Sequence, residues 1–253
     1  GSNETYGQLG IDNGNTNVSS FVQVGALTTW LAAATGYHFS LLRKSDGTLW
    51  SCGQNNNGQL GLGNTSTYTL PTQIGVLTTW RKVASGNYTS FATKADGTLW
   101  GWGNNGSGQL GQGDTTNYSS PVQVGALTDW ADVWFAGSNM VALKTDGTIW
   151  GCGANATGQL GNGDTTGRSS PVQAGAETTW AAVTTAGAAT MAVNTDGALW
   201  TWGSGGQGAL GLGNTTNYSS PKQVGALTDW LSVSGGTGRQ CIALKTDGTL
   251  WAW

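Results

Sequence analysis

The sequence predicts an all-β protein, a five-bladed β-propeller with four-stranded antiparallel blades, on three observations. Tryptophan recurs every fifty residues in two series, and an Asp-Gly pair follows a β-prone run at the same step. No stretch shows the apolar period of an amphipathic helix. Self-similarity at such a period indicates a repeat fold whose units bury apolar faces against their neighbours. The two series are Trp30, Trp80, Trp130, Trp180 and Trp230, and Trp50, Trp100, Trp150, Trp200 and Trp251.

The central hairpin of each module is the most regular element, and the third module illustrates it. Residues Val141–Cys152 contain two β-prone runs separated by Asp146-Gly147. Asp-Gly in this position predicts a type I′ turn, which needs positive φ at both residues. Across a ladder with that turn we expect Leu143 to face Trp150, and Val141 to face Cys152.

Two further strands complete each predicted blade. A short β-prone run, Trp130–Val133, precedes the hairpin, and Pro121–Val124 is an example of the outer strand. Proline donates no backbone hydrogen bond and therefore suits the first residue of an edge strand. Gly-Gln-Leu-Gly segments such as Gly58–Gly61 connect the strands, because glycine permits tight bends and close backbone approach.

One domain, residues 1–253, accounts for the whole chain as five repeats of about 50 residues. Joined end to start, Leu250–Trp253 and Gly1–Gly10 read like Leu99–Gly111 with one extra residue. We therefore expect the N- and C-terminal segments to pair, complete one blade and close the ring. A stacked solenoid is the alternative, although the end modules here lack the polar caps usual in such folds.

Composition argues against several classes of function. Only 9% of the residues are charged, the net charge is −3, and basic residues form no run longer than two. We therefore expect no nucleic-acid partner. No apolar window is long enough to span a membrane, and no signal peptide is recognisable. The three cysteines form no disulfide framework, and Cys52 and Cys152 occupy the repeat position of Trp102, which predicts buried space-filling thiols.

The repeat resembles the regulator of chromosome condensation repeat family along its whole length. The clearest copy is Lys94–Gly103, followed by Gly108–Gly111 and Pro121–Val124. The resemblance implies a β-propeller used as an interaction platform, but family members differ so widely in activity that the fold transfers no function. Many members have seven blades, so the five modules leave open a five-bladed ring or a segment of a longer array.

Residues suited to catalysis or metal binding are sparse. His38 is the single histidine, and no cysteine cluster has metal-ligand spacing. No serine lies in a nucleophile-elbow pattern and no phosphate-binding loop is present. We therefore expect no catalytic residue, no metal and no cofactor.

The segment between the first strand and the hairpin diverges most between modules. Corresponding loops of a propeller gather on one face around its axis, where aromatic, amide and guanidinium groups form a stacking and hydrogen-bonding surface. The candidate ligand-binding residues are Tyr37, His38, Phe39, Asn87, Tyr88, Trp134, Phe135, Asn139, Arg239 and Gln240.

These observations favour a non-enzymatic binding or structural module whose ligand is a protein or a glycan. The alternatives are a purely architectural repeat scaffold and an enzyme that uses His38. The chain also contains many glycosylation sequons, of which Asn117-Tyr118-Ser119 is one. Such a number favours a bacterial or viral source that never meets the glycosylation machinery, with display on a virion or cell surface.

Overall fold

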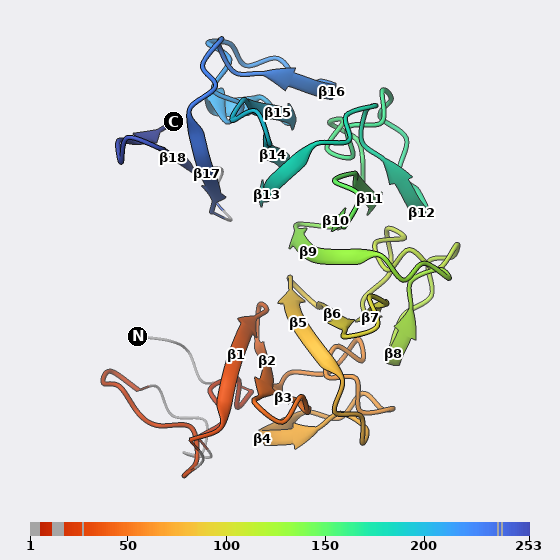
Figure 1. The fold of residues 1–253 in the computed structure, drawn as a ribbon. Coiled ribbons are helices and arrows are strands. Elements are labelled where there is room, and N and C mark those ends of the chain that lie inside the picture. The colour runs from red at the N-terminus through yellow and green to blue at the C-terminus, as the bar shows by residue number, and fades with distance from the viewer. Residues whose placement is uncertain (1–5, 12–17, 27, 237, 239) are drawn as a thin grey trace. The chain divides into compact units, whose positions relative to one another are not determined.

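The computed structural model describes residues 6–11, 18–26, 28–236, 238 and 240–253. These residues form five antiparallel sheets whose strands pair in chain order, and the helical content is one turn, Gly206–Gly208 (Figure 1). The prediction of an all-β repeat fold is confirmed. The chain forms two compact units, the first of residues 1–106 and 115–128, and the second of residues 107–114 and 129–253.

Unit 1 contains two four-stranded sheets. The first is built from β1 (Trp30–Thr35), β2 (Phe39–Lys44), β3 (Leu49–Gly53) and β4 (Tyr68–Gln73), and the second from β5 (Trp80–Ser85), β6 (Thr89–Lys94), β7 (Leu99–Gly103) and β8 (Tyr118–Gln123).

Unit 2 contains the remaining three sheets. The third has β9 (Trp130–Ala136), β10 (Asn139–Lys144), β11 (Ile149–Gly153) and β12 (Arg168–Gln173), and the fourth has β13 (Trp180–Ala186), β14 (Ala189–Asn194), β15 (Leu199–Gly203) and β16 (Tyr218–Gln223). The fifth has three strands, β17 (Trp230–Gly235), β18 (Cys241–Lys245) and β19 (Leu250–Ala252). The expected closure by the terminal segments draws on both units and on residues 1–5, which lie outside the described residues, and it stays a prediction.

The hairpin turn differs from the predicted type I′ turn. Asp146 does not adopt positive φ, whereas Gly147 does, at 79°. The amide of Gly147 donates to the carbonyl of Lys144, and the amide of Lys144 donates to the carbonyl of Thr148, so the loop has three residues. This is a type I turn followed by a glycine bulge.

The extra loop residue moves the register by one, and the predicted cross-strand pairs are wrong. Leu143 lies opposite Ile149 rather than Trp150, and Met140 rather than Val141 lies opposite Cys152. Because side chains alternate between the two faces of a strand, a shift of one residue exchanges the faces.

The sequence predicted that proline begins the outer strand, and this is wrong, because proline lies inside the strand. β8 starts at Tyr118, and Pro121 is its fourth residue. Gly101 pairs with Val122 and Gly103 pairs with Tyr118, so the register shifts around the proline. A bulge on an edge strand tolerates a residue without an amide hydrogen.

A lysine, two tryptophans, a threonine and the turn aspartate form a repeated cluster. In the second sheet the Nζ of Lys94 lies 3.6 Å from the ring centroid of Trp100 and 4.9 Å from that of Trp80. The indole of Trp100 donates to the Thr98 hydroxyl at 2.8 Å, and that hydroxyl donates to Asp96 at 2.7 Å. The cluster therefore combines a cation–π contact with a threonine hydroxyl that both accepts and donates a hydrogen bond.

Glycine-rich loops such as Gly58–Gly61, which lie between the third and the outer strand of a sheet, contact the next sheet within a unit. The carbonyl of Gln59 accepts hydrogen bonds from the indole of Trp102 at 3.0 Å and from the hydroxyl of Ser90 at 2.8 Å. In the third sheet the thiol of Cys152 donates to the carbonyl of Gln109 at 3.2 Å. Cysteine therefore replaces tryptophan both in the core and as the hydrogen-bond donor, which explains the shared repeat position.

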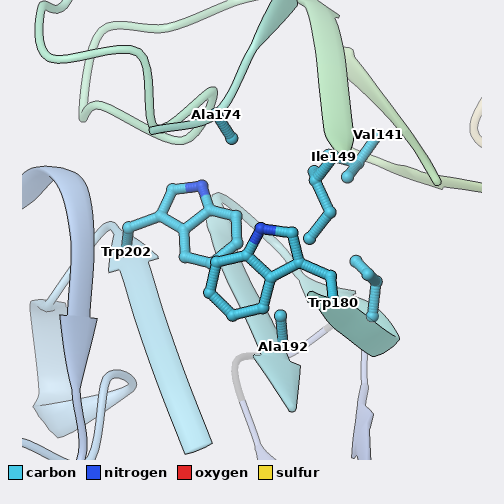
Figure 2. Packing of buried hydrophobic residues seen from close by; sticks show 7 residues of the cluster. Val141, Ile149, Ala174, Trp180, Ala192 and Trp202 are labelled. Carbon is cyan, nitrogen blue, oxygen red and sulfur yellow. The ribbon is translucent and has the colours of Figure 1, made fainter. Parts of the chain in front are cut away.

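The core of unit 2 lies between sheets rather than within one of them. Figure 2 shows Trp180 and Trp202 beside each other, with Ile149 of the neighbouring sheet close to Trp180. The two indole rings lie 5.9 Å apart at 45°. All three side chains are at most 3% exposed, so most of their surface is removed from water.

Candidate functional site

Four aromatic side chains of unit 1, Tyr6, Tyr37, His38 and Tyr88, form what we call the aromatic patch. The rings of Tyr37 and His38 lie 4.1 Å apart and those of Tyr37 and Tyr88 lie 5.8 Å apart, both edge to face. Tyr6 lies 5.1 Å from His38. Tyr37 is 62% exposed and the other three side chains are half-buried, so Tyr37 is the part of the patch that projects furthest into solvent.

Two loops carry the patch, the β1–β2 connection and the β5–β6 connection. The amide of Tyr37 donates to the carbonyl of Asn87 at 3.1 Å, which joins the loops through their backbones. A Cβ at Gly36 would lie 2.6 Å from the carbonyl oxygen of Gly86 and within 2 Å of the Phe39 ring. Glycine at position 36 is therefore required for the loops to approach this closely.

The other candidates of unit 1 divide between the surface and the core. Asn87 is exposed and lies on the same loop as Tyr88. Phe39 is 1% exposed, because it is the first residue of β2 and its side chain is enclosed by the sheet and by Gly36. Phe39 therefore supports the loops and offers no contact surface.

The candidates of unit 2 are mostly structural. Trp134 pairs with Val141 in the β9–β10 ladder and packs against the core cluster that contains Trp180. Phe135 lies opposite Met140 and is half-buried. Asn139 is 2% exposed. β9 extends three residues beyond the predicted Val133, and this extension draws Trp134 into the ladder.

The last two candidates lie between β17 and β18. Gln240 is exposed, and Arg239 lies outside the described residues.

Sequence reasoning missed Tyr6. The carbonyl of Gln8 accepts a hydrogen bond from the Ser40 hydroxyl at 2.7 Å, so Gly7–Gly10 holds the first sheet as Gly58–Gly61 holds the second. Tyr6 precedes that loop and so lies beside His38 of the following module. The alignment of the repeats in the sequence could have located Tyr6, because it places Gly7–Gly10 with the other linking loops.

Other chemistry is sparse in the part of the chain that the structure describes. Among these residues no group of three His, Cys, Asp or Glu side chains could hold a metal ion. None of the described helical turns is long and apolar enough to cross a bilayer. No disulfide joins the three buried cysteines, and burial raises the pKa of the Cys152 and Cys241 thiols. Protonated, buried thiols are poor nucleophiles.

Comparison with protein families gives a match over most of the chain. The family described as "Regulator of chromosome condensation (RCC1) repeat" matches residues 46–93, 96–143, 146–193 and 196–241. A second description of the same repeat matches residues 32–59 and 80–109. No curated protein matches the chain in sequence.

Solved structures show the same fold at low sequence identity. Human WBSCR16 is 23% identical with a TM-score of 0.81, and the match covers 96% of this chain and 66% of that one. Prp20p from Saccharomyces cerevisiae, described with its binding to Gsp1p and histones, is 22% identical with a TM-score of 0.71, covering 87% and 56%. Yeast RCC1 (Prp20) bound to Kap60 is also 22% identical, with a TM-score of 0.72, covering 87% and 54%. The chain therefore spans between about half and two thirds of these structures.

Proposed function

The chain belongs to the regulator of chromosome condensation (RCC1) repeat family, and from that premise we propose a non-enzymatic scaffold that binds a protein through the aromatic patch. The observation that carries the proposal is the exposed contact of Tyr37 with His38 and Tyr88 on two joined loops. Protein-binding surfaces are enriched in tyrosine, which offers large contact area at low conformational cost.

The support beneath the patch favours binding over a passive role. Phe39 is enclosed below the loops, and the hydrogen bond from Tyr37 to Asn87 fixes their separation. Rigid aromatic anchors lose little entropy when a partner binds. Each phenol also retains a hydroxyl that can donate and accept a hydrogen bond.

A protein ligand is chosen over a glycan because of the family. The yeast relative Prp20p is described as binding Gsp1p and histones, and another structure holds it bound to Kap60. We expect a partner that differs from those of the relatives, because the loops that carry the patch vary in sequence from module to module.

The test uses a random peptide library displayed on phage, selected on the purified chain. We expect enriched peptides to bind the Tyr37→Ala/Tyr88→Ala variant at least about tenfold more weakly. The matched control is Val76→Ala, which removes an 87% exposed side chain from another loop of unit 1 and should leave binding unchanged. The melting temperature of Val76→Ala should equal that of the wild type within error. The double variant should stay folded and melt only slightly lower, because it loses the ring contacts of Tyr37 and Tyr88.

Two results would contradict the proposal. Enriched peptides that bind the double variant as well as the wild type would place the contact surface elsewhere. A glycan array in which sugars bind and lose affinity through Tyr37 and Tyr88, while no peptide is enriched, would replace the protein ligand by a glycan.

A further inference from the structure

A groove of unit 1 lies between the first and the second sheet, and a buried lysine, Lys94, forms part of its wall. The groove has a volume of about 380 Å³, which lies in the range of small-molecule sites, about 300–1,000 Å³. The apolar part of the wall is formed by Ile74, Leu77, Trp80, Trp100 and Pro121.

The ammonium group of Lys94 has no carboxylate partner. The residue is 8% exposed, and its Nζ lies over the rings of Trp100 and Trp80. No described residue forms an ion pair with this Nζ or accepts a hydrogen bond from it. Buried ammonium groups are ordinarily paired, because removal of the charge from water is costly.

The corresponding lysines of two other sheets do have such a partner. The Nζ of Lys144 lies 3.3 Å from a carboxylate oxygen of Asp129, and that of Lys245 lies 3.2 Å from Asp229. Each aspartate comes just before the first tryptophan of its sheet. An opposite charge at this distance favours the charged lysine and offsets the cost of burial. The repeat therefore includes a place for a carboxylate beside the ammonium.

In the second sheet Thr79 occupies that place. The carbonyl of Thr79 accepts the amide of Ala95 at 2.9 Å, as the carbonyl of Asp129 accepts the amide of Thr145 at 2.8 Å. The two backbones therefore correspond, and the difference lies in the side chain. Threonine brings no charge, and Thr79 is exposed, so a solute can reach this position.

The wall of the groove also contains an unused hydrogen-bond donor. The indole nitrogen of Trp80 is buried and has no acceptor among the described residues. In the first sheet the corresponding nitrogen of Trp30 lies 3.4 Å from the carbonyl of Val24, which has the repeat position of Ile74. The indole nitrogen is also unpartnered in the first tryptophans of the third, fourth and fifth sheets, so the unpaired lysine is what distinguishes the second sheet from these three.

The first sheet has a similar but smaller groove. Its volume is about 260 Å³, and it is lined by Trp30 and Trp50. Thr29 replaces the aspartate there as well, but Lys44 is not among the described residues that line this groove. The second sheet therefore combines the larger groove with a cation in its wall.

We propose that the groove of the second sheet binds a small organic carboxylate with an apolar tail. The carboxylate occupies the place that the aspartates hold in the third and fifth sheets, and the tail lies along Ile74, Leu77 and Pro121. A charge-assisted hydrogen bond fixes the head group, and the apolar wall removes the tail from water. This site is separate from the aromatic patch, because Trp80 begins β5 whereas Tyr88 follows its end, about 20 Å along the strand.

The experiment titrates the whole chain with hexanoate and follows binding by saturation-transfer difference NMR. We expect saturable binding with a Kd of about 1 mM or below, and binding of the uncharged hexanamide about tenfold or more weaker. The Thr79→Asp variant supplies an internal carboxylate to Lys94 and should bind hexanoate about tenfold or more weakly. The matched variant Thr79→Asn has a similar shape and no charge, and it should bind like the wild type.

Two further variants locate the site. Lys94→Met removes the ammonium and should weaken hexanoate binding about tenfold or more, with the wild-type near-ultraviolet circular dichroism retained. Thr29→Asp places a carboxylate beside Lys44 and should leave binding unchanged.

Four results would overturn the proposal. They are the absence of saturable hexanoate binding to the wild type, equal binding of hexanoate and hexanamide, equal binding to Thr79→Asp and Thr79→Asn, and a loss of binding in Thr29→Asp instead of Thr79→Asp.

Discussion

The fourth sheet lacks two members of the repeated lysine–tryptophan cluster, and restoring them should stabilise the protein. Asn194 replaces the lysine and Ala198 replaces the threonine. The ring geometry is retained, since Trp180 and Trp200 lie 6.0 Å apart at 87°, against 6.1 Å and 83° for Trp80 and Trp100. The indole nitrogen of Trp200 is buried and has no hydrogen-bond partner among the described residues.

The Asn194→Lys/Ala198→Thr variant should regain two interactions. The threonine hydroxyl gives the buried indole a partner, a net gain of about 1 kcal/mol. The lysine adds a cation–π contact of about 0.5–1 kcal/mol. Burial of the ammonium offsets part of this gain, as it lowers the pKa of Lys94 in the intact cluster. The amide of residue 198, which donates to the Asn194 side chain at 2.9 Å, must take Asp196 as its acceptor instead, as the Thr98 amide donates to Asp96. The net stabilisation is about 1–2 kcal/mol, which raises the melting temperature by about 2–8 °C for a chain of this size.

Differential scanning calorimetry of the wild type, both single variants and the double variant measures this effect. Coupling between the two substitutions is expected, because both new side chains contact Trp200. The reverse substitution, Thr98→Ala, removes the partner of the Trp100 indole and should cost about 1–3 kcal/mol. A double variant no more stable than the wild type, together with a neutral Thr98→Ala, would refute the reasoning.

Three further predictions follow from the turns, thiols and glycines. Hydrogen bonds from the neighbouring threonine hydroxyl and amide hold the pKa of Asp46, Asp96, Asp146 and Asp247 below the ordinary value of 3.8. Stability from a depressed carboxyl pKa is present above the unfolded value and lost as pH falls through the folded one. As the pH is lowered below about 4, the melting temperature should therefore decrease, and it should decrease less steeply in Thr98→Val than in the wild type. Parallel curves of melting temperature against pH for the two proteins would contradict this. Burial raises the pKa of Cys241 to about 11 and that of Cys152 further. A disulfide reagent at pH 8 should therefore label these thiols only at the rate of unfolding. Labelling within the mixing time would contradict this prediction. Gly58→Ala should cost about 1–3 kcal/mol more than Gly208→Ala in urea titrations, because both glycines have φ near 80° but only the first meets a neighbouring strand; equal costs would contradict the geometry.

Periodicity was sufficient to predict the sheets, because it reports burial that recurs with each module. The type of the hairpin turn was not predictable from Asp146-Gly147 alone. That pair fits both a two-residue and a three-residue loop. The hydrogen bond from the amide of Lys144 to the carbonyl of Thr148 makes it a three-residue loop. Register therefore depended on a hydrogen bond rather than on residue type.

The candidate site was predicted in part, for a related reason. Tyr37, His38 and Tyr88 gather because adjacent modules place the same loop side by side. Trp134 also broke the repeat pattern, yet it packs against the core of unit 2. Departure from a repeat pattern shows where side chains are free to vary and does not distinguish a surface position from a core position.

The bond from each linking loop to the following sheet means that the folding module is out of phase with the repeat in the sequence. Gln59 belongs by sequence to the module of β3 and β4, yet its carbonyl holds Trp102 and Ser90 of the second sheet. A fragment cut at the tryptophan period, from residue 80 to 129, would therefore lose the loop that secures its own strands. Repeats to be transplanted, duplicated or deleted should instead be divided between the third strand and the glycine-rich loop, so that every loop travels with the sheet it holds.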